Sequence, residues 1–201
     1  MKFCILMGSP RLEGNTAALL GPFLEECGAM EVETQVISLY DREINPCWGC
    51  AACQNVLDGL GCVQDDSFEE IFQAMADSDV IVLATPIYAF FCTAPMKALL
   101  DRAIYAGTKN YGAVKGPRLL EGRRVVSIVT CGYPPEQGAG LWEEGLKRFC
   151  RHGGMEYLGI LCRRDWGKGE PFLNEEREQA ARDFAQALAL ALRSDEMARL
   201  T

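Results

Sequence analysis

Histidine is almost absent from this sequence. His152 is the only one among 201 residues. A Ser-His-Asp or Cys-His catalytic arrangement would therefore depend on one side chain in an Arg-His-Gly-Gly segment, where a capping or solvated role is expected. Dense clusters of lysine and arginine are missing as well, and the formal net charge is −8. Because nucleic-acid binding needs a basic surface, we expect no nucleic-acid partner.

Long apolar runs are also missing. The segment before Gly8 is too short for the hydrophobic region of a signal peptide, and no uncharged apolar run reaches membrane-spanning length. We therefore expect a cytoplasmic protein without membrane association. With 49% hydrophobic and 24% charged residues, the composition is typical of a globular protein. A chain of this length fits one domain, which we predict over residues 1–201.

Short apolar segments alternate with amphipathic segments along the chain. Strand patterns occur at residues 2–7, 32–39, 79–84, 123–131 and 156–162. Helical spacing occurs at residues 16–27, 67–77, from about 95, 139–152 and 175–192. The glycine-rich stretch 107–122 is expected to be irregular. Strands separated by helices predict an α/β fold with a parallel sheet and helices on both faces.

The segment GSPRLEGNTAAL follows the first predicted strand and leads into a helix. Ser9, Asn15 and Thr16 supply side-chain donors, Arg11 supplies a cation, and the glycines let backbone amides point inward. A phosphate group would meet these donors and the positive end of a helix dipole. The segment matches neither G-x-G-x-x-G nor the P-loop, which disfavours dinucleotides and nucleoside triphosphates. We predict an anion site here, with a plain strand-to-helix turn as the alternative.

Aromatic and apolar residues follow the third predicted strand. The segment TPIYAFF places Pro86, Ile87 and Tyr88 at the end of the sheet, where a flat ring could bind or where they could join the core of the next helix. The fourth strand is followed by small side chains and backbone amides, at Thr130, Cys131 and Gly132. Ligands of open parallel sheets bind beyond the carboxyl ends of the strands, so these loops are expected to share a site.

Four of the ten cysteines lie within PCWGCAACQNVLDGLGC, at Cys47, Cys50, Cys53 and Cys62. Four thiolates are enough for one cubane, and the first three have the spacing of ferredoxin-type [4Fe-4S] sites. Structural zinc sites more often use two separated C-x2-C pairs. A [4Fe-4S] cluster, free thiols in a loop near a cofactor, and another metal or a redox disulfide all stay open. The scattered cysteines are expected to be buried among apolar residues, as at Cys4, Cys27, Cys131 and Cys150.

These motifs resemble the flavodoxin-like NAD(P)H-dependent FMN reductases and their relatives, the iron-sulfur flavoproteins. The resemblance rests on GSPRxxGNT, on TPIY with Lys97, Asp101 and Arg102 in the next helix, and on a Cys-rich loop at 46–64 that ends at the pair Asp65-Asp66. It implies a flavodoxin-like three-layer sandwich with a five-stranded parallel sheet in the order 2-1-3-4-5. It also implies FMN, with its phosphate at Ser9, Arg11, Asn15 and Thr16 and its ring at Pro86, Ile87, Tyr88, Thr130, Cys131 and Gly132.

The function implied is an FMN-binding oxidoreductase. It would pass electrons from NAD(P)H or a reduced carrier to a flavin, quinone or other small acceptor, through a [4Fe-4S] cluster if the four cysteines bind one. The chemistry would belong to the flavin, without a catalytic side chain. Members of the family commonly form homodimers or homotetramers, so we expect a homo-oligomer. A non-catalytic flavodoxin-like electron-transfer protein and a cysteine-based metal or redox sensor are the alternatives.

Overall fold

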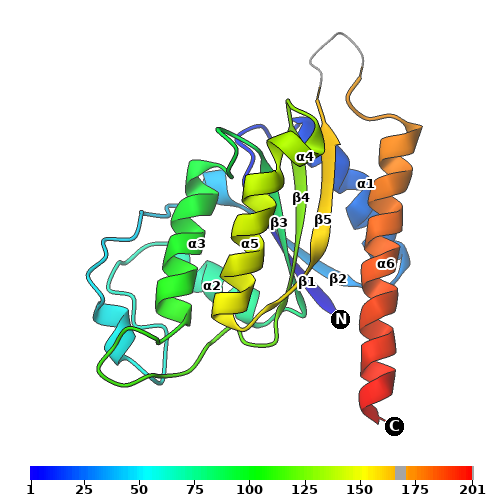
Figure 1. The fold of residues 1–201 in the computed structure, drawn as a ribbon. Coiled ribbons are helices and arrows are strands. Elements are labelled where there is room, and N and C mark those ends of the chain that lie inside the picture. Colours follow the sequence, from blue (N-terminus) through cyan, green and yellow to red (C-terminus); the bar gives the residue numbers. More distant parts are fainter. Residues whose placement is uncertain (166–170, 201) are drawn as a thin grey trace.

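A five-stranded parallel sheet forms the centre of the molecule (Figure 1). The computed structural model describes residues 1–165 and 171–200, apart from the side chains of residues 195–197, 199 and 200. The strands are β1 (Lys2–Met7), β2 (Glu33–Ser38), β3 (Val80–Pro86), β4 (Arg124–Cys131) and β5 (Glu156–Arg164). Their order is β2-β1-β3-β4-β5, and every neighbouring pair is parallel. The predicted sheet and strand order are confirmed.

Helices cover both faces of the sheet (Figure 1). One face carries α1 (Asn15–Ala29) and α6 (Glu175–Leu200), and the other carries α2 (Phe68–Ala76), α3 (Ala94–Gly107) and α5 (Gly140–Gly153). Short helical turns occur at α4 (Pro135–Gly138), η1 (Leu39–Asp41) and η2 (Ala52–Asn55). The result is the predicted three-layer sandwich.

The apolar patterns of the sequence explain these elements. Residues 80–85 of β3 are buried without exception, because the strand lies between two helical layers. In α2 the residues on one face are all buried against the sheet, as their helical spacing predicts: Phe68, Ile71, Phe72 and Met75. Two apolar clusters result, one on each side of the sheet.

Three details differ from the expected elements. The helix expected at 139–152 is preceded by α4, and the last helix continues past residue 192 to Leu200. The short η2 turn lies inside the Cys-rich loop, where no helix was expected. In the stretch 107–122 the structure is irregular, as predicted, apart from a bridge between Thr108 and Arg118. Within the described part of the chain, no helix is both long and apolar enough to cross a membrane.

Candidate functional site

The carboxyl ends of all five strands meet at one edge of the sheet (Figure 1). From β1 the chain crosses to β2 on one side of β1, and it then returns to β3 on the other side. The direction in which strands are added to the sheet therefore reverses at β1, and such a topological switch point is where open α/β sheets bind ligands. The loops after β1, β3 and β4 therefore surround the expected ligand position.

The loop after β1 is a compact turn at the start of α1. The Gly8 amide donates to Ala84 O at 2.7 Å, and the Gly14 amide donates to Arg11 O at 3.1 Å. A Cβ atom on Gly14 would lie 2.9 Å from Arg11 Cβ, so the turn requires glycine there. Among the described residues, no side chain caps the N-terminus of α1 and no acidic residue lies in its first turn. An uncapped helix N-terminus of this kind fits a phosphate group.

The four residues predicted for the phosphate have different surroundings. The Arg11 amide donates to the hydroxyl of buried Ser9 at 3.2 Å, and the Arg11 side chain is exposed. The Asn15 side-chain amide donates to Asp165 Oδ2 at 2.5 Å. Thr16 is buried, and its hydroxyl lies 2.9 Å from that of Thr130. The structure thus brings Ser9 and Arg11 into one turn, while Thr16 joins the β1 loop to the end of β4.

A cavity of about 410 Å³ lies between the loops after β3 and β4. Its lining residues are Ile87, Ala89, Phe90, Cys131, Gly132, Tyr133 and Gly138. Ile87, Cys131 and Gly132 belong to the predicted ring site. Pro86 and Thr130 are paired within the sheet, and Tyr88 is exposed beside the cavity. Ala89, Phe90, Tyr133 and Gly138 were not predicted as site residues, although aromatic residues close to both strand ends were a signal for two of them.

A strained turn presents Phe90 at the rim of this cavity. Tyr88 and Phe91 exchange two backbone hydrogen bonds of 2.8 and 3.0 Å, while Ala89 and Phe90 have φ values of 48° and 71°. Positive φ at both central positions normally selects Asn-Gly or Gly-Gly. The Phe90 ring stacks on the Tyr133 ring at a centroid distance of 6.0 Å. Strain of this kind is often found at functional sites.

Two cysteines meet beside the same cavity. The sulfur atoms of Cys131 and Cys162 are 3.5 Å apart, on neighbouring strands. The hydrogen bond from Cys162 lowers the pKa of the Cys131 thiol, burial opposes this, and the charge of Arg164 lowers it further. By contrast, burial raises the pKa of the core thiols to about 12, at Cys4, Cys27, Cys92 and Cys150. Cys131 therefore has the most activated thiol among these buried cysteines.

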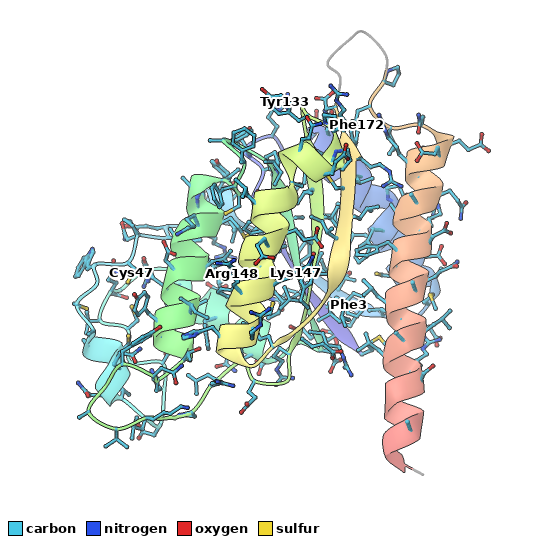
Figure 2. The ribbon with its side chains drawn as sticks, viewed as in Figure 1. Phe3, Cys47, Tyr133, Lys147, Arg148 and Phe172 are labelled. Atoms are coloured by element: carbon cyan, nitrogen blue, oxygen red, sulfur yellow. The ribbon has the colours of Figure 1, made fainter. Side chains whose placement is uncertain are left out.

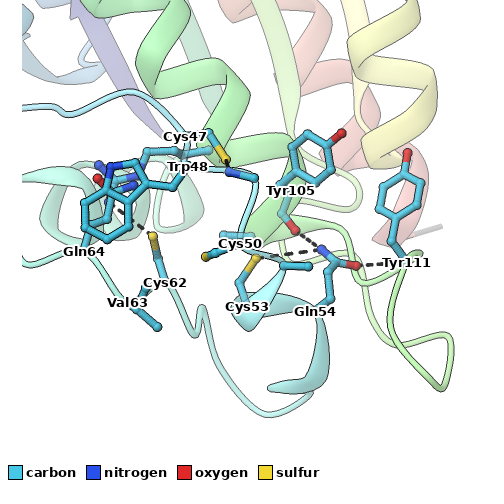
Figure 3. A pocket seen from close by; sticks show the side chains of 14 residues that line it. Cys47, Trp48, Cys50, Cys53, Gln54, Cys62, Val63, Gln64, Tyr105 and Tyr111 are labelled. Atoms are coloured by element: carbon cyan, nitrogen blue, oxygen red, sulfur yellow. Dashed lines mark hydrogen bonds between the residues drawn. The ribbon is translucent and has the colours of Figure 1, made fainter.

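The four clustered cysteines line one smaller cavity of about 110 Å³ (Figure 3). Cys62 returns to Cys47, Cys50 and Cys53 although eight residues separate it from Cys53. The other lining residues include Trp48, Tyr105 and Tyr111, and we call this cavity the cysteine pocket. In the described ranges, no three Cys, His, Asp or Glu side chains are gathered closely enough to hold one metal ion. The four thiols line one cavity, and cysteine thiolates are the ligands that iron-sulfur clusters use.

Buried charges border the cysteine pocket. Arg102 Nη1 lies 2.5 Å from Asp66 Oδ2, with both side chains inaccessible to solvent, and Arg102 Nη2 donates to Cys62 Sγ at 3.3 Å. Burial alone would raise the pKa of Asp66, but hydrogen bonds from Arg102 and from two backbone amides outweigh it and lower the pKa. One of these amides belongs to Phe68, the first residue of α2, so Asp66 also accepts a hydrogen bond from the start of that helix.

The cysteine pocket and the cavity at the strand ends are separate places in one chain. None of the residues that the structure describes lines both. Cys47 lies beside α3, whereas Tyr133 lies beyond the carboxyl end of β4 (Figure 2). The pocket is lined from the carboxyl half of α3, by Arg102, Tyr105 and Ala106. Within one chain the cysteine loop therefore does not border the cavity expected for a ring.

Comparison with known proteins agrees with this geometry. The family model for NADPH-dependent FMN reductase matches residues 1–157. The chain belongs to the NADPH-dependent FMN reductase family. The chain is 40% identical over 103 residues to an iron-sulfur flavoprotein of Methanocaldococcus jannaschii, covering 51% of this chain and 52% of the relative. It is 36% identical over 160 residues to an iron-sulfur flavoprotein of Archaeoglobus fulgidus, covering 80% of this chain and 65% of the relative.

These two relatives are longer than the regions they share with this chain. The chain spans about half to two thirds of their length. The fold is shared more widely: an NAD(P)H:quinone oxidoreductase from Methanothermobacter marburgensis superimposes with a TM-score of 0.68 at 16% identity, covering 94% of this chain and 97% of the other. At that identity the likeness shows the fold.

Proposed function

We propose that this protein is an FMN-binding oxidoreductase that passes electrons from NAD(P)H or a reduced carrier to a flavin, quinone or other small acceptor. The observation that carries the proposal is the cavity of about 410 Å³ at the switch-point edge, with the stacked Phe90 and Tyr133 rings at its rim. Membership of the FMN reductase family supports FMN as the cofactor.

The chain's own residues would divide between the phosphate and the ring. We assign the phosphate to the turn from Ser9 to Thr16 and the uncapped start of α1, where amides and a helix dipole attract an anion. We assign the ring to the cavity lined by Ile87, Cys131 and Gly132. When bound, FMN supplies a ring that accepts and releases electrons. Phe90 and Tyr133 would shield the cavity from water and offer a flat apolar surface to a planar acceptor.

The proposal is tested with protein purified without oxygen. We expect flavin absorption bands, or uptake of added FMN, and steady-state oxidation of NADH or NADPH with a water-soluble quinone. Tyr133→Ala should slow quinone turnover and Tyr40→Ala, an exposed tyrosine of η1, should not. Protein that neither contains nor takes up FMN contradicts the proposal. FMN uptake without NAD(P)H oxidation would favour a non-catalytic electron-transfer protein.

As a second part of the proposal, a [4Fe-4S] centre at Cys47, Cys50, Cys53 and Cys62 would receive electrons for an outside carrier. Support comes from the shared pocket of the four thiols and from the relatives named iron-sulfur flavoproteins. Iron, acid-labile sulfide and zinc are counted per chain, and we expect about four iron and four sulfide ions, as in a cubane. Stoichiometric zinc without iron would replace this part with a metal-sensing role.

A further inference from the structure

Lys109 ties together the two ends of the segment that returns Cys62 to the cysteine pocket. Its side chain is fully buried in the irregular stretch between α3 and β4. The Lys109 ammonium donates to the carbonyl oxygens of Cys53 and Leu60, each at 2.8 Å. These carbonyls lie at opposite ends of the connection between Cys53 and Cys62. One side chain thus bridges the two ends of this loop, and we call these two hydrogen bonds the tie.

Neighbouring contacts hold the beginning of the same loop. The Gln54 side-chain amide donates to the carbonyls of Tyr105 and Thr108, and its oxygen accepts from the Tyr111 amide at 2.8 Å. A Cβ atom on Gly116 would lie 2.6 Å from Leu57 Cδ2 and 2.8 Å from Lys109 Cβ. The loop between Cys53 and Cys62 therefore packs closely against residues 108–116. The Lys109 ammonium is a buried charged group in this contact.

The charge of Lys109 has no carboxylate partner among the described residues. Arg102 lines the cysteine pocket, and its charge is balanced by Asp66. The described residues of this region thus include two buried cations, Lys109 and Arg102, and one buried carboxylate, that of Asp66. A buried cation without an opposite charge is costly, so the surplus positive charge favours a negatively charged occupant.

We propose that Lys109 is a positioning residue of the cysteine pocket: it holds Cys53 and Cys62 on one pocket wall and supplies the counter-charge for a thiolate-bound metal centre. Metal binding deprotonates the cysteines, and a centre with four thiolate ligands carries net negative charge. Neutral thiols or a disulfide would leave the Lys109 ammonium without an opposite charge. The identity of the centre rests on the proposed function, whereas the tie between Cys53 and Leu60 does not.

The tie is tested by hydrogen exchange in the full-length protein, before and after removal of metal. Lys109→Met removes the donor and the charge, and should speed amide exchange of residues 54–61 at least tenfold. Lys115→Met is the matched control, because this lysine lies in the same stretch and is exposed. We expect it to exchange as wild type does. Unchanged exchange in Lys109→Met would overturn the tie.

The charge is tested with Lys109→Gln, which keeps a side-chain amide donor and removes the cation. We expect less iron and sulfide per chain than in wild type, or a centre with a more negative reduction potential, measured by electron paramagnetic resonance during a redox titration. Wild-type iron content together with a wild-type potential would contradict the counter-charge role.

If Lys109→Met does not fold, Lys109→Gln also serves for the hydrogen-exchange measurement. We then expect protection of residues 54–61 between that of wild type and that of an open loop, and wild-type protection would overturn the tie. Wild-type protein without any bound metal would refute the proposed centre, and the exchange comparison would still decide the tie.

Discussion

At the scale of single residues, the pair of Asp66 and Arg102 joins three parts of the structure. Asp66 accepts from the Phe68 amide at the start of α2 and from the Asn45 amide just before the Cys-rich loop, and it pairs with Arg102 of α3. Asp66→Asn would leave the Arg102 charge buried without a partner. We expect it to lower the free energy of unfolding by about 3–5 kcal/mol at neutral pH, measured by urea denaturation. Asp101→Asn, which breaks an exposed pair with Lys97, should cost less than about 1 kcal/mol.

The same pair gives stability a defined dependence on pH. The pKa of Asp66 is lower in the folded chain than the usual 3.8, so the unfolded chain takes up the proton first as the pH falls. The stabilisation is therefore complete above pH 3.8 and is lost as the pH falls through the folded pKa. The difference between wild type and Asp66→Asn should shrink in that range. A difference that stays constant down to pH 3 would contradict this account.

Cys131 and Cys162 give a second prediction at this scale. Because a hydrogen bond from Cys162 lowers the pKa of Cys131, Cys162→Ala should raise that pKa and slow alkylation of Cys131 by iodoacetamide severalfold at pH 7. Cys162→Ser keeps a donor and should lie between the two. Peptide mass spectrometry measures the modification, with buried Cys150 as an internal control that stays unmodified. Equal rates in all three proteins would refute the role of Cys162.

At the scale of elements, η2 depends on a close approach of the stretch between α3 and β4. A Cβ atom on Gly112 would lie 2.5 Å from the carbonyl oxygen of Gln54 in η2. Gly112→Ala should therefore displace η2, lower the free energy of unfolding by about 1–3 kcal/mol and speed alkylation of Cys53. Gly59→Ala is the control, because the nearest atom to its Cβ would be 4.0 Å away. Equal stability of the two variants would contradict the close contact.

The turn at Ala89 and Phe90, at the rim of the strand-end cavity, has a strained backbone. Ala89 has a φ of 48°, a conformation that costs an L-residue about 1–2 kcal/mol and glycine almost nothing. Ala89→Gly should raise the free energy of unfolding by about 0.5–1 kcal/mol after the entropy of the unfolded chain is counted. Ala113→Gly, in a loop position without positive φ, should lower it slightly. Thermal denaturation shows whether each variant is more or less stable than wild type. Destabilisation by Ala89→Gly would show that the turn is not strained.

Sequence patterns predicted the elements far better than the contacts between them. The buried run of β3 and the apolar face of α2 are local signals, so the strands, the helices and a parallel sheet could be predicted from them, whereas the strand order came from the family resemblance. The Ala89 and Phe90 turn could not be predicted, because neither residue favours positive φ and the surrounding pairing imposes it. Lys109 gave no signal either, since its burial depends on carbonyls 49 and 56 residues away in the chain.

At the scale of the whole molecule, the two candidate sites are formed by different parts of the fold, one by loops at the ends of the strands and the other by the Cys-rich loop and α3. The strand-end cavity uses loops that follow β3 and β4, while the cysteine pocket is attached to α3 through Arg102 and Tyr105. The first depends on the sheet order, and the second on the fit of two irregular segments against a helix. Side chains that share no partners usually contribute independently to stability and binding. The two sites should therefore be separable by mutation within one chain.

The test of this separation replaces all four clustered cysteines with serine. The variant should lose iron and keep the FMN affinity of wild type, measured by quenching of flavin fluorescence, with urea denaturation confirming that it is folded. Thr16→Val, which removes the hydroxyl contact with Thr130, should weaken FMN binding and leave the iron content unchanged. If the serine variant is folded yet binds FMN poorly, the cysteine loop must reach a strand-end cavity after all. Since the two places are apart in one chain, that cavity would then belong to a second copy, which ties this result to the expected homo-oligomer.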